Sequence, residues 1–404
     1  MGLIMKIHPS NKKALFALAM GGFGIGLTEF VIMGILTEVA EALQVTIAEA
    51  GHFIAAYALG VVVGAPTLTG LGSKLAPRRM LFLLMVWFTV FNTLSGLADN
   101  YHMLMVLRFL SGIPHGAFFG IGAVVATKLV KEGKGAQAIA VMFTGLTVAN
   151  VLGVPLGTYL GHHFSWSVSF YMVGVVGLIT MCSLYFWVPK ISIPVLPDTG
   201  SMAARLKNGE LWALIALTTI GTGGFFAWYS YIAPLVKEVA GLPDHFVGYA
   251  MMLAGLGMVA GNFLGAKMAE RFSPLPAVII SLSAMALILV VNMIIATNPW
   301  LLLAFTFLIG VVSFTVSAPI QMAIINSAKG LEMLGSSMNQ SAFNMGNASG
   351  AYLAGLPIAM GYGVAFSSLV GAFLAALGVA IALLILMARR HRQKRANEME
   401  LGSR

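Results

Sequence analysis

The sequence predicts an all-α integral membrane protein with twelve transmembrane helices, arranged as two pseudo-symmetric six-helix halves. Of its 404 residues, 59% are hydrophobic and only 9% are charged, against about 25% charged in soluble globular proteins. The mean hydropathy is +0.91. Too few polar side chains remain to cover a soluble fold of this length, which excludes a soluble enzyme and a disordered chain. The single cysteine, Cys182, excludes a disulfide scaffold and a Cys-x-x-Cys metal site.

Twelve apolar stretches are long enough to cross a hydrocarbon core about 30 Å thick, which needs a helix of roughly 20 residues. They lie at residues 14–36, 48–71, 79–97, 103–127, 137–159, 166–187, 211–235, 246–268, 275–296, 300–325, 333–358 and 364–387. Helices are expected because lipid offers no partner for backbone polar groups, and these stretches are too long and too uniformly apolar for barrel strands. The first stretch is too long for a signal-peptide core and no small-residue cleavage site follows it, so we expect it to be retained.

The basic residues predict the orientation of the chain. Of the 23 Lys and Arg residues, 21 lie before the first stretch, after the last, or in every second connection. Lys237 lies on the opposite side, and Arg108 falls inside a stretch. By the positive-inside rule, both termini are expected in the cytoplasm. Basic loops beside anionic lipid then account for the net charge of +9, and no basic patch interleaved with aromatic residues points to a nucleic acid.

An internal repeat supports the division into halves. The motif Leu59-Gly60-x-x-x-Gly64 recurs as Leu256-Gly257-x-x-x-Gly261, and Asn150-x-x-Gly153 recurs as Asn347-x-x-Gly350, both shifted by 197 positions. Such glycines also serve close helix packing by themselves. Two matches at one offset nevertheless favour a repeat, and repeated six-helix halves place a transport site between them near the bilayer midplane.

The polar, proline-containing stretch 188–210 is the longest between the apolar runs. We interpret it as a cytoplasmic linker. It separates an N-terminal half of residues 1–187 from a C-terminal half of residues 211–404, which ends in a basic cytoplasmic tail.

Four motifs resemble the major facilitator superfamily, in particular its twelve-helix drug:proton antiporter branch and the AraJ-type arabinose-efflux permeases. The resemblance covers nearly the whole chain. The motifs are Thr28-Glu-Phe-Val-Ile-Met-Gly34, Ala50-Gly-His52 with Tyr57-Ala-Leu-Gly60, Arg108-Phe-Leu-Ser-Gly-Ile-Pro-His-Gly-Ala-Phe-Phe-Gly120, and Gly145-Leu-Thr-Val-Ala-Asn-Val-Leu-Gly-Val-Pro-Leu-Gly157. They are typical of the branch and not of one substrate.

The resemblance implies a conformational motif that this chain carries only in part. The family's loop between spans 2 and 3 reads G-x-x-x-D-R-x-G-R-R, whereas here Lys74, Leu75 and Pro77 replace its acid, first arginine and second glycine. The span 5 antiporter motif has Val154-Pro155 in place of Gly-Pro, and the second half keeps Glu270-Arg271. The residues retained for conformational change are Gly70, Arg78, Arg79, Gly153, Pro155 and Gly157.

Away from the span ends, two charged residues fall inside the predicted spans, Glu29 and Arg108. Ionisable groups at membrane depth are costly and indicate function. At 1.5 Å rise per residue, they lie roughly 10 Å and 8 Å from the outer boundary, so they could meet. The pKa of a carboxyl rises in an apolar cavity and falls beside an arginine. Glu29 is therefore predicted to carry protons with electrostatic help from Arg108, which matches an arginine that the family assigns to proton transfer. The alternative is a buried ion pair that only fixes helix packing.

His115 lies two helical turns after Arg108 and shares its face. Because histidine titrates near neutral pH, it is a candidate proton relay, the alternative being a packing histidine. No metal-ligand spacing, catalytic triad or nucleotide-binding loop is present. We therefore expect no enzyme, no cofactor and no metal.

Polar and aromatic residues within spans are the candidates for binding a solute: Asn150, Trp228, Tyr231, Gln321, Gln340, Asn344 and Asn347. The last three lie at i, i+4 and i+7 and form one polar stripe on a helix. A polar stripe facing lipid is costly, so this stripe faces protein or water. Interhelical hydrogen bonding is the alternative role.

We predict a secondary active transporter that exchanges protons for a small solute by alternating access. The resemblance implies a monomer in the bacterial inner membrane that exports a sugar such as arabinose or a small amphipathic drug. One alternative is a proton-coupled or passive importer on the same fold. The other is a membrane sensor without transport, which would usually carry a soluble signalling domain, whereas the longest stretch outside the membrane here has only about 23 residues.

Overall fold

The computed structural model describes residues 9–45, 47–72, 75–191, 207–243 and 245–402, and the regular elements in these ranges are helices. The first half contains α1 (Pro9–Gly34), α2 (Leu36–Leu43), α3 (Ile47–Leu71), α4 (Pro77–Ser95), α5 (Tyr101–Lys128), α6 (Gly135–Val148), the π-helical turn η2 (Ala149–Gly153), α7 (Val154–His163) and α8 (Trp166–Trp187). The second contains α10 (Gly209–Tyr229), α11 (Ile232–Pro234), the π-helical turn η3 (Leu235–Val239), α12 (His245–Phe272), α13 (Pro274–Ile295), α14 (Pro299–Phe314), α15 (Ser317–Ser327), α16 (Glu332–Ala359) and α17 (Phe366–Gly402).

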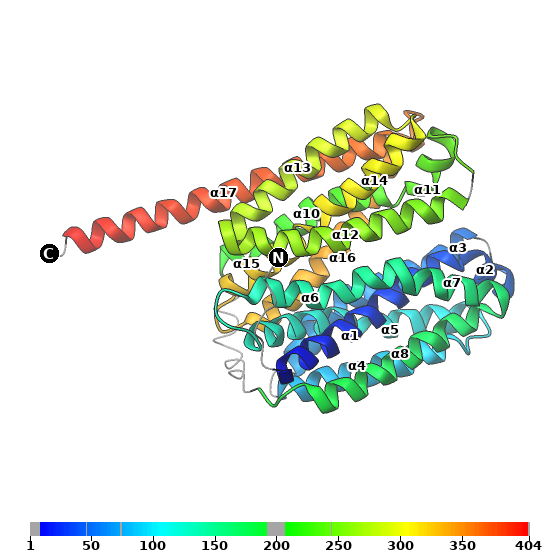
Figure 1. The fold of residues 1–404 in the computed structure, drawn as a ribbon, viewed down its shortest axis with the longest axis horizontal. Helices are drawn as coiled ribbons and strands as arrows, with labels where there is room; N and C mark the ends of the chain where they lie inside the picture. The colour runs from blue at the N-terminus through cyan, green and yellow to red at the C-terminus, as the bar shows by residue number, and fades with distance from the viewer. Residues whose placement is uncertain (1–8, 46, 73–74, 192–206, 244, 403–404) are drawn as a thin grey trace.

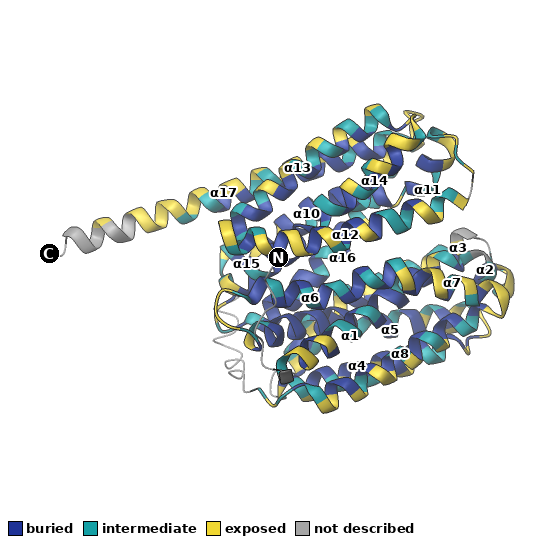
Figure 2. Cartoon of the chain, viewed as in Figure 1, coloured by how far each residue is buried: buried dark blue, intermediate teal, exposed yellow. Residues whose placement is uncertain are grey.

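The predicted class, an all-helical membrane protein of two six-helix halves, is confirmed. Ten helices among the described residues are long and apolar enough to cross a membrane. The other two predicted spans correspond to α4 and α16, helices of 19 and 28 residues. Both are more polar, because α4 begins with Arg78 and Arg79 and α16 carries the amide stripe. Many Leu, Ile and Phe side chains are exposed, as expected of surfaces that meet lipid. Figure 2 shows exposed residues along the outer sides of the helices in view.

The Leu-Gly-x-x-x-Gly part of the sequence repeat has the same structural role in both halves. A Cβ atom on Gly60 or Gly64 of α3 would lie 2.2 Å from a backbone oxygen of α5. A Cβ atom on Gly257 or Gly261 of α12 would lie 2.2 Å and 1.9 Å from backbone oxygens of α14. Only glycine allows helix axes to approach so closely, so the repeated glycines position equivalent helix pairs.

Three local features differ from the predicted spans. The short helix α2 follows the first span. The fifth span changes to the π-helical turn η2 just before Pro155, since proline lacks the N–H that would continue the α-helical ladder. The last helix is longer than the predicted span. It continues through the basic tail to Gly402, and this part of α17 projects from the molecule (Figure 1). Most of the predicted linker, residues 192–206, lies outside the described residues.

The two halves lie side by side and contact each other at the end of the molecule where α8 ends and α10 begins, which we call the linker end (Figure 1). There the hydrophobic cluster of the first half continues into the second through Ala266, Ala269, Ile325 and Met333. At the opposite end, α2, α7, α11 and η3 pack against helices of their own half. The described halves are thus closed against each other at the linker end.

Candidate functional site

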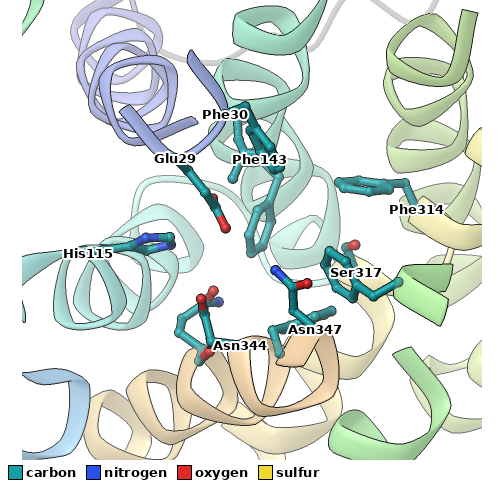
Figure 3. A pocket seen from close by; sticks show the side chains of 12 residues that line it. Glu29, Phe30, His115, Phe143, Phe314, Ser317, Asn344 and Asn347 are labelled. Atoms are coloured by element: carbon teal, nitrogen blue, oxygen red, sulfur yellow. Dashed lines mark hydrogen bonds between the residues drawn. The ribbon is translucent and has the colours of Figure 1, made fainter. Parts of the chain in front are cut away.

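A cavity lies between the two halves, with an empty volume of about 500 Å³. Its polar lining comes from α1, α5, α15 and α16, namely Glu29, His115, Ser317, Gln340, Asn344 and Asn347. Figure 3 shows Glu29 and His115 on one side and Phe314 and Ser317 on the other, with Asn344 and Asn347 between them. Polar residues from both halves of the sequence therefore meet at one site, which we call the central cavity.

The amide stripe of α16 faces this cavity. Gln340, Asn344 and Asn347 all line it, and Asn344 Nδ2 donates to Gln340 O at 3.0 Å. Phe343 lies within the same stripe and also lines the cavity. One helix face therefore presents amide donors and acceptors next to an aromatic ring, a combination typical of small-molecule sites.

Arg108 is fully buried near Glu29, but it hydrogen-bonds to Thr28, the residue before Glu29. The guanidinium donates from Nη1 to Thr28 Oγ1 at 3.0 Å and from Nη2 to Thr28 O at 3.2 Å. The hydroxyl of Thr28 in turn donates to Asn92 Oδ1. No ion pair joins Glu29 to Arg108, two residues that the structure describes in full. Arg108 thus holds α1 in place and leaves the Glu29 carboxyl facing the cavity.

A tyrosine connects Arg108 with His115. The Arg108 guanidinium carbon lies 4.4 Å from the centroid of the Tyr57 ring, a favourable cation–π distance. The Tyr57 hydroxyl lies 3.1 Å from His115 Nδ1. The His115 ring is buried but also lines the central cavity. Glu29 and His115, the two titratable residues among those that line the cavity, are therefore linked through Thr28, Arg108 and Tyr57.

The other predicted solute-binding residues do not line the central cavity. Gln321 is completely buried and accepts hydrogen bonds at Oε1 from Asn339 Nδ2 at 2.5 Å and Gln340 Nε2 at 3.4 Å, so it supports the stripe from behind. Asn150 is buried in η2, and Trp228 is buried in the hydrophobic cluster of the second half. The Tyr231 hydroxyl donates to Ala351 O at 3.1 Å.

Sequence reasoning missed most of the apolar lining. Leu146 and five phenylalanines complete the cavity: Phe30, Phe143, Phe226, Phe314 and Phe343. Among 25 phenylalanines, only Phe343 had a signal in the sequence, because it lies on the amide stripe. Thr28 and Tyr57 were also missed as partners of Arg108, and Asn92 was missed as the acceptor for the Thr28 hydroxyl, although all three are polar residues within spans.

The residues of the predicted conformational motif lie in two regions. Near the linker end, Arg78 donates to Tyr185 O and stacks on the Tyr185 ring at 5.4 Å, Arg79 is exposed, and nothing approaches Gly70 within 4 Å of a Cβ position. In the fifth span, Gly153 packs on Phe23 and Leu27, Gly157 packs on Val31, and Pro155 is exposed. Lys74 lies outside the described residues.

An ion pair connects the halves at the linker end. Lys134 Nζ at the start of α6 lies 2.9 Å from Glu270 Oε2 on α12, and Gln137 Nε2 donates to the same oxygen at 2.7 Å. Glu270 is the acid that the second half retains. No group of three His, Cys, Asp or Glu side chains able to hold a metal ion occurs in the part of the chain that the structure describes.

Comparisons with known proteins agree with this architecture. The profile of the Major Facilitator Superfamily matches residues 18–338 and 231–403. AraJ of Escherichia coli K12 is 39% identical over 386 residues, 96% of this chain and 98% of AraJ. The inner membrane transport protein YdhP of the same strain is 40% identical over 380 residues, 93% of this chain and 96% of YdhP. The MFS-type transporter YtbD of Bacillus subtilis is 34% identical over 354 residues, 86% of this chain and 89% of YtbD.

Solved structures share the fold at low sequence identity. A crystal structure of the Escherichia coli fucose:proton symporter FucP superposes with a TM-score of 0.74 at 13% identity, and one of the Major Facilitator Superfamily transporter FucP superposes with a TM-score of 0.73 at 15% identity. Each comparison covers 93% of this chain and 99% of the FucP chain, and the second structure is in the outward conformation. The family resemblance seen in the motifs is thus confirmed, and this multi-pass membrane protein belongs to the Major Facilitator Superfamily of transporters.

Proposed function

We propose that this transporter exports a small solute in exchange for protons by alternating access. The central cavity carries the proposal: it lies between the halves and contains the carboxyl of Glu29. A carboxyl facing a site that opens in turn to each side of the membrane can take a proton from one side and release it to the other. The solute and the proton would then bind in the same cavity, so the binding of one would affect the binding of the other.

In this proposal, the network behind Glu29 has a positioning role. Arg108 keeps its charge in every state, and its bonds to Thr28 hold the adjacent Glu29 at a constant place on α1. His115 would respond to the same proton because Tyr57 connects it with Arg108. The amides of α16 would hold polar groups of the solute.

The proposed orientation places the linker end in the cytoplasm of a bacterial inner membrane, as the basic loops and the name of the relative YdhP suggest. Since the central cavity is formed within one chain, a monomer is sufficient. Export, the proposed direction of transport, follows from the resemblance to the efflux branch.

Proton movement in proteoliposomes tests the function. An internal pH dye would report changes after a pH gradient is imposed and arabinose, other sugars and small drugs are added in turn. Dissipation by one solute in the wild type and in Glu332→Gln, but not in Glu29→Gln, is expected. Glu332 is a matched acid because it bonds only within its own loop in the described structure, to Gly330 N at 2.8 Å. Normal coupling in Glu29→Gln would contradict the assignment, and reversing the gradient would show the direction.

A further inference from the structure

A second cavity adjoins the central cavity on the side of the second half. It has an empty volume of about 330 Å³ and shares Phe226, Phe314, Ser317 and Phe343 with the central cavity. Its deeper lining includes Thr222 of α10, Met285 of α13, and Ser313 and Val316 around the end of α14. We call this cavity the side pocket. Because four residues border both cavities, the side pocket is a direct neighbour of the central cavity.

The side pocket is apolar even where its residues are not. Thr222 Oγ1 donates to Thr218 O at 2.7 Å, and Ser313 Oγ donates to Ile309 O at 2.6 Å. Both hydroxyl protons are therefore bonded to carbonyl groups of their own helices. The remaining surface consists of phenylalanine rings, the Met285 thioether, Val316 and, at the border with the central cavity, Ser317.

This surface discriminates between classes of solute. A sugar hydroxyl placed beyond the border residue Ser317 would lose water and find no free donor on Thr222 or Ser313, which is unfavourable. An aryl or short alkyl group would lose no hydrogen bond and would gain the burial of its apolar surface. Phenylalanine rings at the border, of which Phe314 is visible in Figure 3, also provide faces and edges for aromatic contacts.

We propose that the side pocket holds an apolar arm of the transported solute while its polar head lies among Glu29, Asn344 and Asn347. The substrate class is then an amphipathic molecule with one aryl or short alkyl arm, and not a free monosaccharide. This inference rests on the proposed function only in taking the central cavity as the solute site; it does not depend on proton coupling.

Binding of four probes to the purified protein tests the inference. Arabinose is compared with benzyl arabinopyranoside, and tetramethylammonium with benzyltrimethylammonium, so that head and arm vary separately. Burying a group of the size of a phenylalanine side chain is expected to tighten binding at least about tenfold for the preferred head. Equal affinity with and without the arm, for a head that binds, would overturn the inference and leave the proposed function intact.

Filling the side pocket should remove the gain alone. Ser313→Leu and Val316→Phe place bulk in the pocket, and both should bind the heads as the wild type does but lose the advantage of the arm. Leu308→Phe adds similar bulk on an exposed face of α14, the helix that contains Ser313. This variant should keep the advantage of the arm. An arm advantage that persists in both pocket-filling variants would contradict the inference. If Glu29→Gln changes proton coupling but keeps the advantage of the arm, the result bears on the role of Glu29 in coupling and supports the side pocket as the site of the arm.

A chemical probe decides the case in which none of the four probes binds. Cys182, the exposed native cysteine, is replaced by serine, and Ser313→Cys is treated with methanethiosulfonates that carry a benzyl or a charged ethyl group. The thiolate forms a mixed disulfide and releases methanesulfinate. Faster reaction with the benzyl reagent, compared with its rate on free cysteine, is expected of a reachable apolar pocket. No reaction, or no preference for benzyl, would overturn the inference.

Discussion

Replacing Glu270 by glutamine is expected to weaken the contact between the halves at the linker end. The change removes the charge that attracts Lys134 Nζ at 2.9 Å and weakens the hydrogen bond from Gln137 at 2.7 Å, while the size of the side chain is kept. Because Lys134 belongs to the first half and Glu270 to the second, the loss acts on the association of the halves and not on the packing within either one.

The magnitude follows from how far the pair is exposed. The side chains of Lys134 and Glu270 are 36% and 16% exposed, so solvent screens the pair only in part. Its contribution is therefore near the upper end of the roughly 0.2–1 kcal/mol found for surface pairs. The second donor to the same oxygen is weakened and not lost, which adds a few tenths of that amount. We expect about 1–1.5 kcal/mol in total, a five- to tenfold shift toward states that are open at the linker end.

Distances between spin labels would measure the shift. Labels on Lys131→Cys and Lys267→Cys, both exposed and in opposite halves, report the separation at the linker end in a Cys182→Ser background. A longer-distance population should grow in Glu270→Gln and remain unchanged in Glu332→Gln, whose acid contacts its own half. An unchanged distance distribution in Glu270→Gln would refute the reasoning that this pair holds the halves together.

Three further predictions concern stability. Gly261→Ala should lower the free energy of unfolding by about 1–3 kcal/mol, since its Cβ would lie 1.9 Å from Val311 O; Gly248→Ala on the same helix meets nothing within 4 Å and should not lower the melting temperature. Tyr57→Phe removes the hydroxyl 3.1 Å from His115 Nδ1 and should cost about 0.5–1.5 kcal/mol in thermal unfolding, while the ring over Arg108 remains; no change would mean that the contact is not a stabilising hydrogen bond. Pro155→Ala restores an N–H after η2 and should slow amide hydrogen exchange in this turn; unaltered exchange would show that proline does not cause the π-helical turn.

The spans could be predicted because lipid imposes one requirement on every helix that crosses it. The predicted stretch 166–187 coincides with α8, and most other boundaries differ by a few residues. The largest difference is at the end of α17, where the helix continues beyond the predicted span into the basic tail and the lipid requirement ceases. Charged residues can continue a helix in water, so composition marks the end of a span and not the end of a helix.

Within the site, the sequence predicted which residues must avoid lipid but not what each one faces. Gln321 and Gln340 are both amides within spans, and the same argument applies to both. Gln340 lines the central cavity, whereas Gln321 is buried behind it and bonded to Asn339. A polar side chain within a span can find hydrogen-bond partners on a neighbouring amide as well as in a cavity. Only the positions of the adjacent helices decide which of the two it meets. Likewise, Arg108 hydrogen-bonds to Thr28 and not to Glu29. The spacing of residues along a helix does not give the distances that decide this.

Two of the helix contacts that close the linker end differ in kind, because among the described residues only one of them includes an ion pair. Between α6 and α12, Lys134 and Glu270 form an ion pair, in addition to the neutral hydrogen bonds that Asn262 Nδ2 donates to Ala140 O at 2.6 Å and Thr144 Oγ1 at 3.3 Å. Between α3 and α16, described residues form neutral hydrogen bonds: the Thr69 and Ser337 hydroxyls lie 2.7 Å apart, and Ser341 Oγ donates to Val62 O at 2.9 Å. The first-half loop has Lys74 where the family has an acid, whereas the second half retains Glu270. Salt should therefore weaken the α6–α12 contact and leave the α3–α16 contact largely unaffected. With Glu270→Gln, high salt should no longer change the label distances, and a salt response that persists would place the controlling charges elsewhere.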